Sequence, residues 1–167
     1  MTKRGSIPLI AVMMIVGSSC VPLPRWCYLA VTRVEPLTGA EGFSVSDVSR
    51  AKFVAAEVAK KIGMVTRDDD PKTLETEQWL SANEKPPREY LISYYGKMSQ
   101  GLPIELRVEI SQDRRALYFS VSDPEEGAGR PVVARIRSLM MANVEAAYPD
   151  ASIVHEASTR GPFFDHP

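Results

Sequence analysis

Two segments of the chain repeat apolar residues at steps of three and four, which is the spacing of one face of an α-helix. The first ends at Ile62, just before Gly63, and begins behind a cap at Ser44 or Ser46. Its apolar stripe comprises Val48, Ala51, Ala55, Val58 and Ile62. The second spans about 131–148, opens on a proline and is followed by another. Both segments are predicted to be amphipathic helices that pack one face against the rest of the domain.

A shorter helix is predicted to begin at Pro71, because proline suits the first helical position and Asp70 can cap it. Pro86 and Pro87 end that segment. The acidic run 68–70 is not expected to bind calcium. A calcium loop needs acids at alternating positions, a glycine turn and a distal Glu, and these are absent here.

Strands are predicted at 26–34, 90–95, 104–110, 117–121 and 152–157. The clearest is 104–110, where apolar residues alternate with Glu105, Arg107 and Glu109. This alternation places one face of the strand in a core and the other in water. A connecting loop is expected at 96–101.

The order of these elements favours an antiparallel sheet with two main helices packed on one of its faces. The predicted fold class is therefore α+β, a two-layer sandwich. We expect a single domain at 26–160, preceded by a short proline-rich segment at 20–25. A tail at 161–167 shows no periodicity and is expected to be coil.

The composition is that of one globular domain. The 167 residues include 20 Lys+Arg and 21 Asp+Glu, a net charge of -1, with 44% hydrophobic and 25% charged residues. No run of Lys and Arg is long enough to form the basic stripe that nucleic-acid binding needs, so no nucleic-acid partner is predicted. Two cysteines and two histidines leave little material for a metal site, and we predict neither a metal nor a cofactor.

The N-terminus has the three parts of a bacterial export signal. Lys3 and Arg4 give it a basic start, an apolar run follows at 7–16, and the small residues 17–19 lead to Cys20. The apolar run has about ten residues, whereas a membrane-spanning helix needs about twenty. Residues 1–19 are therefore predicted to be a signal peptide.

A cysteine directly after small residues at the end of such a run resembles the lipobox of bacterial lipoprotein precursors. The resemblance implies that Cys20 receives a diacylglyceryl group and becomes the new N-terminus, with 20–25 as a tether. The family usually has Leu or another branched aliphatic residue three positions before the cysteine, and Gly17 stands there. Since Val21 follows where an inner-membrane retention signal would have Asp, the resemblance implies the outer membrane in a Gram-negative host.

Ordinary secretion is the alternative, with cleavage among the same small residues and Cys20 left as a plain cysteine. An exported protein could then join Cys20 to Cys27 in a disulfide. If Cys20 is lipidated, Cys27 is the only remaining thiol in the sequence.

Catalytic motifs are hard to find. No Gly-x-Ser-x-Gly run and no P-loop occur, and the glycines of 127–129 favour a flexible connection before a helix. His155 and Glu156 are adjacent on a predicted strand, which directs their side chains to opposite faces. Asp165 and His166 could bind a metal with His155 only if the tail folded back. No catalytic residue and no metal ligand is predicted.

Four tyrosines are the candidate binding surface, because a strand with aromatic residues on both faces needs either two covered faces or a partner. They are Tyr90, Tyr94, Tyr95 and Tyr118. The sequence thus predicts a non-catalytic envelope lipoprotein, anchored by its lipid and facing the periplasm, that binds a protein or cell-wall partner. The alternative is a periplasmic or secreted enzyme with a site built from scattered residues such as His155, Glu156 and Arg130.

Overall fold

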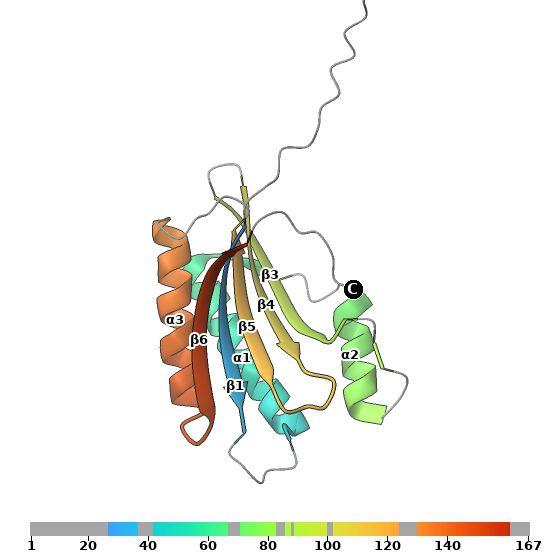
Figure 1. Ribbon diagram of the computed structural model, residues 1–167. Helices are drawn as coiled ribbons and strands as arrows, with labels where there is room; N and C mark the ends of the chain where they lie inside the picture. Colours follow the sequence, from blue (N-terminus) through green and yellow to red (C-terminus); the bar gives the residue numbers. More distant parts are fainter. Residues whose placement is uncertain are drawn as a thin grey trace, which may run out of the picture.

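The computed structural model, shown in Figure 1, describes residues 27–36, 42–66, 71–82, 86–87, 89–99, 102–123 and 130–160. These ranges contain the strands β1 (Cys27–Glu35), β2 (Val65–Thr66), β3 (Leu91–Ser99), β4 (Leu102–Ile110), β5 (Leu117–Asp123) and β6 (Ser152–Arg160). They also contain the helices α1 (Val45–Ile62), α2 (Pro71–Ala82) and α3 (Pro131–Ala147). The predicted signal peptide at 1–19, Cys20, the tether at 20–25, the acidic run 68–70, the glycine loop 127–129 and the tail at 161–167 lie outside the described residues.

The strands form one antiparallel sheet in the order β2-β3-β4-β5-β1-β6. The strands β3, β4 and β5 make a meander, and β1 lies between β5 and the last strand. The helices α1 and α3 pack against each other and against one face of this sheet, with α1 behind the strands in Figure 1. The predicted α+β fold, an antiparallel sheet with two main helices on one face, is confirmed.

Each main helix presents its apolar stripe to the sheet. In α1 the buried residues are Val48, Ala51, Val54, Ala55, Val58, Ala59 and Ile62, and in α3 they are Val133, Ile136, Met140 and Val144. The facing side chains of the central strands are equally buried, among them Ile104, Leu106, Val108, Leu117, Phe119 and Val121. The core therefore lies between the helix pair and β4, β5 and β1.

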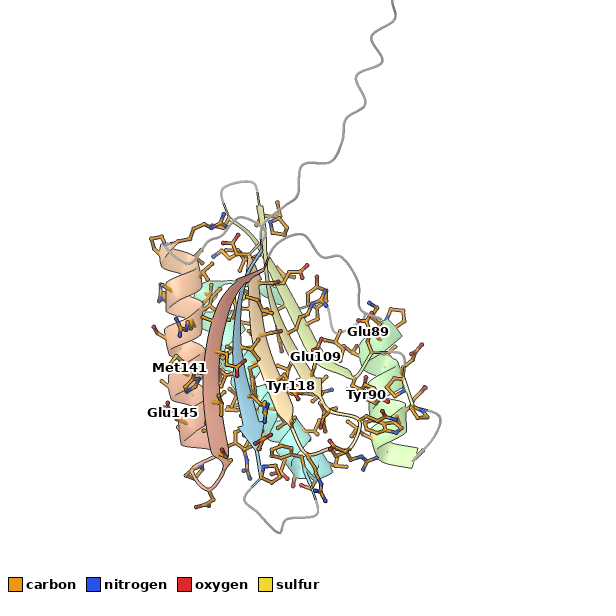
Figure 2. All side chains as sticks on the ribbon, viewed as in Figure 1. Glu89, Tyr90, Glu109, Tyr118, Met141 and Glu145 are labelled. Atoms are coloured by element: carbon orange, nitrogen blue, oxygen red, sulfur yellow. The ribbon has the colours of Figure 1, made fainter. Side chains whose placement is uncertain are left out.

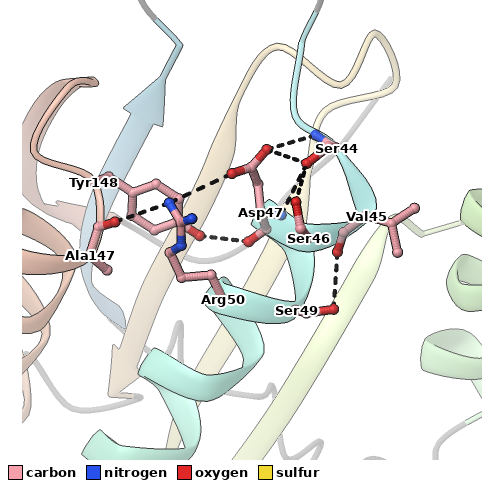
Figure 3. A network of polar contacts seen from close by, with 8 residues as sticks. All are labelled: Ser44, Val45, Ser46, Asp47, Ser49, Arg50, Ala147 and Tyr148. Atoms are coloured by element: carbon pink, nitrogen blue, oxygen red, sulfur yellow. Dashed lines mark hydrogen bonds and ion pairs between the residues drawn. The ribbon is translucent and has the colours of Figure 1, made fainter.

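The ends of α1 are fixed by local hydrogen bonds. Ser44 caps the start, because its hydroxyl accepts from the backbone N–H of Asp47 while the Asp47 carboxylate accepts from the Ser44 N–H at 2.9 Å. Gly63 ends the helix with φ +72°, a left-handed conformation that suits glycine. The start of α1 is also joined to the end of α3, as Figure 3 shows: the Tyr148 hydroxyl donates to the Asp47 carbonyl at 2.7 Å.

The second helix, α2, lies beside β3, on the side of the sheet that ends in β2 (Figure 1). It contacts α1 through an ion pair between Lys52 and Glu77. The indole ring of Trp79 in α2 packs edge-on against the Tyr90 ring, with 5.1 Å between the ring centroids. The predicted start of this helix at Pro71 is confirmed.

Two details of the sheet differ from the prediction. The prediction of a loop at 96–101 is wrong for its first four residues, because β3 continues to Ser99. A two-residue strand, β2, was not predicted and pairs with β3 at Tyr95 and Gly96.

None of the described helices combines the length and apolar character needed to cross a membrane.

Candidate functional site on the open face of the sheet

One face of the sheet is turned away from α1 and α3, and we call it the open face. Side chains on this face come from the residues that alternate with the buried positions of each strand. They include Val31 and Arg33 of β1, Tyr118 and Ser120 of β5, Glu105, Arg107 and Glu109 of β4, and Tyr94 of β3. These positions carry charges of both signs and two aromatic rings.

Tyr94, Glu105 and Arg107 form the most tightly organised group on this face. The Tyr94 hydroxyl donates to the Glu105 carboxylate, and the Arg107 guanidinium lies over the Tyr94 ring, 5.0 Å from its centroid. Arg107 also pairs with Glu105, with 3.3 Å between nitrogen and oxygen. Because Tyr94 is only 8% exposed, its ring acts as a fixed platform under the guanidinium.

The environment of this group sets its charges. Burial, together with the hydrogen bond to Glu105, raises the pKa of the Tyr94 phenol, so the phenol stays neutral and remains a donor. Burial alone would lower the pKa of Arg107, but the Glu105 carboxylate and the Tyr94 hydroxyl outweigh it and the pKa is raised. The group therefore presents one fixed cation beside one fixed anion.

A second polar group lies farther along the same face. Tyr118 stands between Glu109 on β4 and Arg33 on β1 in the register of the sheet, and Figure 2 labels Tyr118 and Glu109. Arg33 pairs with Glu35, whose hydrogen bond and charge raise the pKa of the guanidinium. The side chains of Arg33 and Glu35 are exposed to about the same degree, so this ion pair is accessible from solvent.

Of the four predicted tyrosines, the structure brings Tyr94 and Tyr118 onto the open face. Tyr95 lies on the opposite face, in the core, and Tyr90 is half-buried against Trp79 beside α2. The charged members of the site, Glu105 and Arg107, were not predicted as site residues. Their alternation with apolar residues did predict that they face water, but no sequence signal connects them to Tyr94 on another strand.

The residues of the alternative enzyme site are not brought together. His155 lies on β6 and contacts Glu145 near the end of α3, whereas Arg130 precedes the first residue of that helix. Fifteen helical residues span about 22 Å, so Arg130 and Glu145 are far apart. Glu156 is exposed and next to His155 in the strand, where neighbouring side chains point to opposite faces.

His155 instead joins three elements. Its Nδ1 lies 3.0 Å from the Thr32 hydroxyl on β1, and its Nε2 lies 3.2 Å from the Glu145 carboxylate on α3. A hydroxyl, an imidazole and a carboxylate in this order are the parts of an activated nucleophile. Thr32, however, is only 2% exposed, so a substrate cannot reach its oxygen. The arrangement ties the edge strand to β1 and α3.

A buried ion pair lies at one end of the core. Asp123, at the end of β5, is fully buried and lies 2.9 Å from the Nε of Arg130, which precedes α3. The Arg130 guanidinium also donates to the Ser99 carbonyl at the end of β3. This pair fixes the β5–α3 junction to the β3–β4 hairpin.

Within the described residues, no three metal-ligating side chains gather in one place. No family model, no curated protein and no solved structure matches the chain.

Proposed function

We propose that this protein is an envelope lipoprotein, held to a membrane by a lipid on Cys20 and facing the periplasm, whose domain binds a protein partner through the open face. The proposed membrane is the outer one in a Gram-negative host. The arrangement of residues 1–20 supports the anchor, and the fold supports the binding role, because α1 and α3 cover the opposite face of the sheet.

The observation that carries the binding role is the group formed by Tyr94, Glu105 and Arg107. Tyr and Arg are enriched in the energetically important centres of protein interfaces, where their rigid or planar ends lose little entropy on binding. Here the guanidinium is already held over the ring and paired with a carboxylate. The group is therefore organised before a partner arrives.

The chemistry of the open face favours a protein as the partner. Its cations, Arg33 and Arg107, are interleaved with the carboxylates Glu35, Glu105 and Glu109. A polyanion would meet several carboxylates on such a surface, whereas a protein surface with alternating charges can match both signs. We expect the partner to present at least one acidic and one basic side chain to this face.

The anchor is tested by the intact mass of the mature protein extracted from membranes. We expect a chain that begins at Cys20 and is heavier than its peptide mass by the attached lipid. A plain peptide mass would contradict the anchor, and a further deficit of two hydrogens would identify the disulfide with Cys27.

The binding role is tested by placing a photo-crosslinking amino acid at Tyr118 in the full-length protein in its own envelope. We expect one discrete protein adduct, which disappears when Arg107→Glu is introduced in the same chain. The matched control carries the crosslinker at Phe53 of α1, which is 67% exposed on the other side of the molecule. Equal adducts at both positions, or an adduct unchanged by Arg107→Glu, would contradict the proposal.

A further inference from the structure

The most exposed apolar side chains of the sheet gather at one of its ends. Val65 of β2 is 69% exposed, Met98 of β3 is 63% exposed, and Pro103 of β4 is also exposed. Met98 pairs directly with Pro103, and Val65 pairs with Gly96, two residues from Met98 on the same face. We call Val65, Met98 and Pro103 the end patch.

The end patch lies at the end of the sheet where β1 begins. The register joins Val65, Gly96, Glu105, Ser122 and Leu29 in a single row across the strands. Leu29 is only two residues after Cys27, the first residue of β1. This is the upper end of the sheet in Figure 1. The exposed apolar side chains of the end patch and the start of β1 thus lie at the same end of the sheet.

The chain length before β1 limits how far the domain can stand from its anchor. Seven residue steps separate Cys20 from Cys27, and a fully extended chain covers about 24 Å in seven steps. Three strand spacings, about 14 Å, separate β1 from β3 in the sheet. The end patch is therefore within reach of the membrane surface in which a lipid on Cys20 would be embedded.

The charge beside the patch suits an anionic lipid surface. Lys60 and Lys61 are exposed in the last turn of α1, and the Ile62 carbonyl that follows them accepts a hydrogen bond from Lys97 of β3. Lys60 and Lys61 precede Val65 by five and four residues, so exposed cations on the helix side and exposed apolar side chains on the open face lie at the same end of the sheet. Apolar residues with neighbouring Lys or Arg are the composition of interfacial membrane-contact surfaces.

We propose that the end patch rests on the lipid surface and orients the domain, so that the rest of the open face points away from the membrane toward its partner. This inference rests on the proposed lipid anchor. The groups around Tyr118 and Arg33 lie four residues farther along the strands than the row of Val65, about 13 Å away. They stay accessible while the end patch is in contact with lipid, and Tyr94 and Arg107 lie between the two, two residues beyond the row of Val65.

The test uses the mature acylated protein in vesicles of phosphatidylethanolamine and phosphatidylglycerol. A photo-crosslinking amino acid is placed at Met98, at Val65 or, as the matched control of similar exposure, at Phe53. We expect lipid adducts several-fold more abundant at Met98 and Val65 than at Phe53. We also expect Met98→Asp to reduce the adducts at Val65, and circular dichroism to show that this exposed substitution leaves the fold intact.

The intact mass separates the two ways in which this experiment can fail. If Cys20 carries lipid but adducts are equal at all three positions, the inference is wrong and the anchor stands. Adducts at Met98 that join two protein chains would also overturn it, in favour of contact between copies or with another protein. If Cys20 carries no lipid, the proposed anchor and the inference fall together.

Discussion

Tyr148 is the residue on which the contact between the two main helices depends. Its hydroxyl donates to the Asp47 carbonyl at 2.7 Å, and its ring meets Phe43 edge-on. The Arg50 guanidinium lies over the ring, 5.5 Å from its centroid, and donates to the Ala147 carbonyl at 3.3 Å. Figure 3 shows the hydrogen bonds of Tyr148 and Arg50 where α1 begins and α3 ends. The buried phenol has to remain protonated to keep them.

Tyr148→Phe is expected to change the alkaline stability of the protein. Burial raises the pKa of the Tyr148 phenol well above its unfolded value of about 10, so the stability it contributes is present below pH 10 and is lost as the pH rises further. The variant lacks this group, so its free energy of unfolding should fall less between pH 9 and 11 than that of the wild type. Urea denaturation across that range measures both curves.

At neutral pH the same variant should lose about 0.5–1.5 kcal/mol, because it lacks the hydrogen bond to the Asp47 carbonyl. Tyr118→Phe is the matched control, since Tyr118 lies on the open face, opposite to the face on which the helix pair packs. Parallel alkaline curves for the wild type and Tyr148→Phe would show that the phenol is not the group that titrates.

At the scale of single side chains, the sequence predicts burial well where alternation is strict and poorly where it is not. The apolar and charged positions of 104–110 were assigned correctly because each apolar residue there is followed by a polar one. The segment from Tyr90 to Tyr95 is apolar or aromatic at almost every position. A register shift between Leu91 and Ser93 then places Tyr95 in the core and Tyr94 on the open face. A bulge of this kind leaves no mark in such a sequence.

Among the elements, the junction between β5 and α3 depends most on one interaction. Asp123 is fully buried, and Arg130 reaches it at 2.9 Å while also donating to the Ser99 carbonyl. A buried carboxylate that loses its cation stays buried, because the strand that carries it is held on both sides by hydrogen-bonded neighbours. The junction therefore depends on the pair being kept together.

Arg130→Met is expected to lower the free energy of unfolding by about 3–5 kcal/mol, because it removes the cation that faces the buried Asp123 carboxylate. The double variant Asp123→Leu/Arg130→Met should be less destabilised than the sum of the two single variants. Urea denaturation of the four proteins gives the coupling energy. A cost below about 1 kcal/mol, typical of a surface pair, would show that Asp123 is held by other donors.

The elements that local chemistry determines were predicted with nearly correct ends. Ser44 and Gly63 bracket α1, and Pro71 and Pro131 open α2 and α3, because caps and prolines act within a single turn. The strand β2 has only two residues and exists through its pairing with β3, so no pattern within it could predict it. The candidate site could not be predicted for the same reason. Its residues come from β3, β4 and β5, and the pairing of these strands decides which side chains become neighbours.

At the scale of the whole molecule, the topology places several connections at the end of the sheet where β1 begins. The β3–β4 hairpin and the β5–α3 junction are both there, tied by Arg130, and so is the end of β6, since Cys27 pairs with Arg160. The described chain therefore begins at the end of the sheet that carries the end patch, three strand spacings from β3. A lipid on Cys20 and a Cys20–Cys27 disulfide exclude each other, because each uses the Cys20 thiol.

The thiol content of the mature protein distinguishes these two arrangements. The sequence has two cysteines, Cys20 and Cys27. If Cys20 carries a thioether-linked lipid, the denatured protein should bind one equivalent of maleimide, on Cys27, with or without prior reduction. A Cys20–Cys27 disulfide would instead give none before reduction and two afterwards. The disulfide would join Cys20 and Cys27 in a small loop. The proposed lipid anchor therefore requires one equivalent of maleimide both before and after reduction.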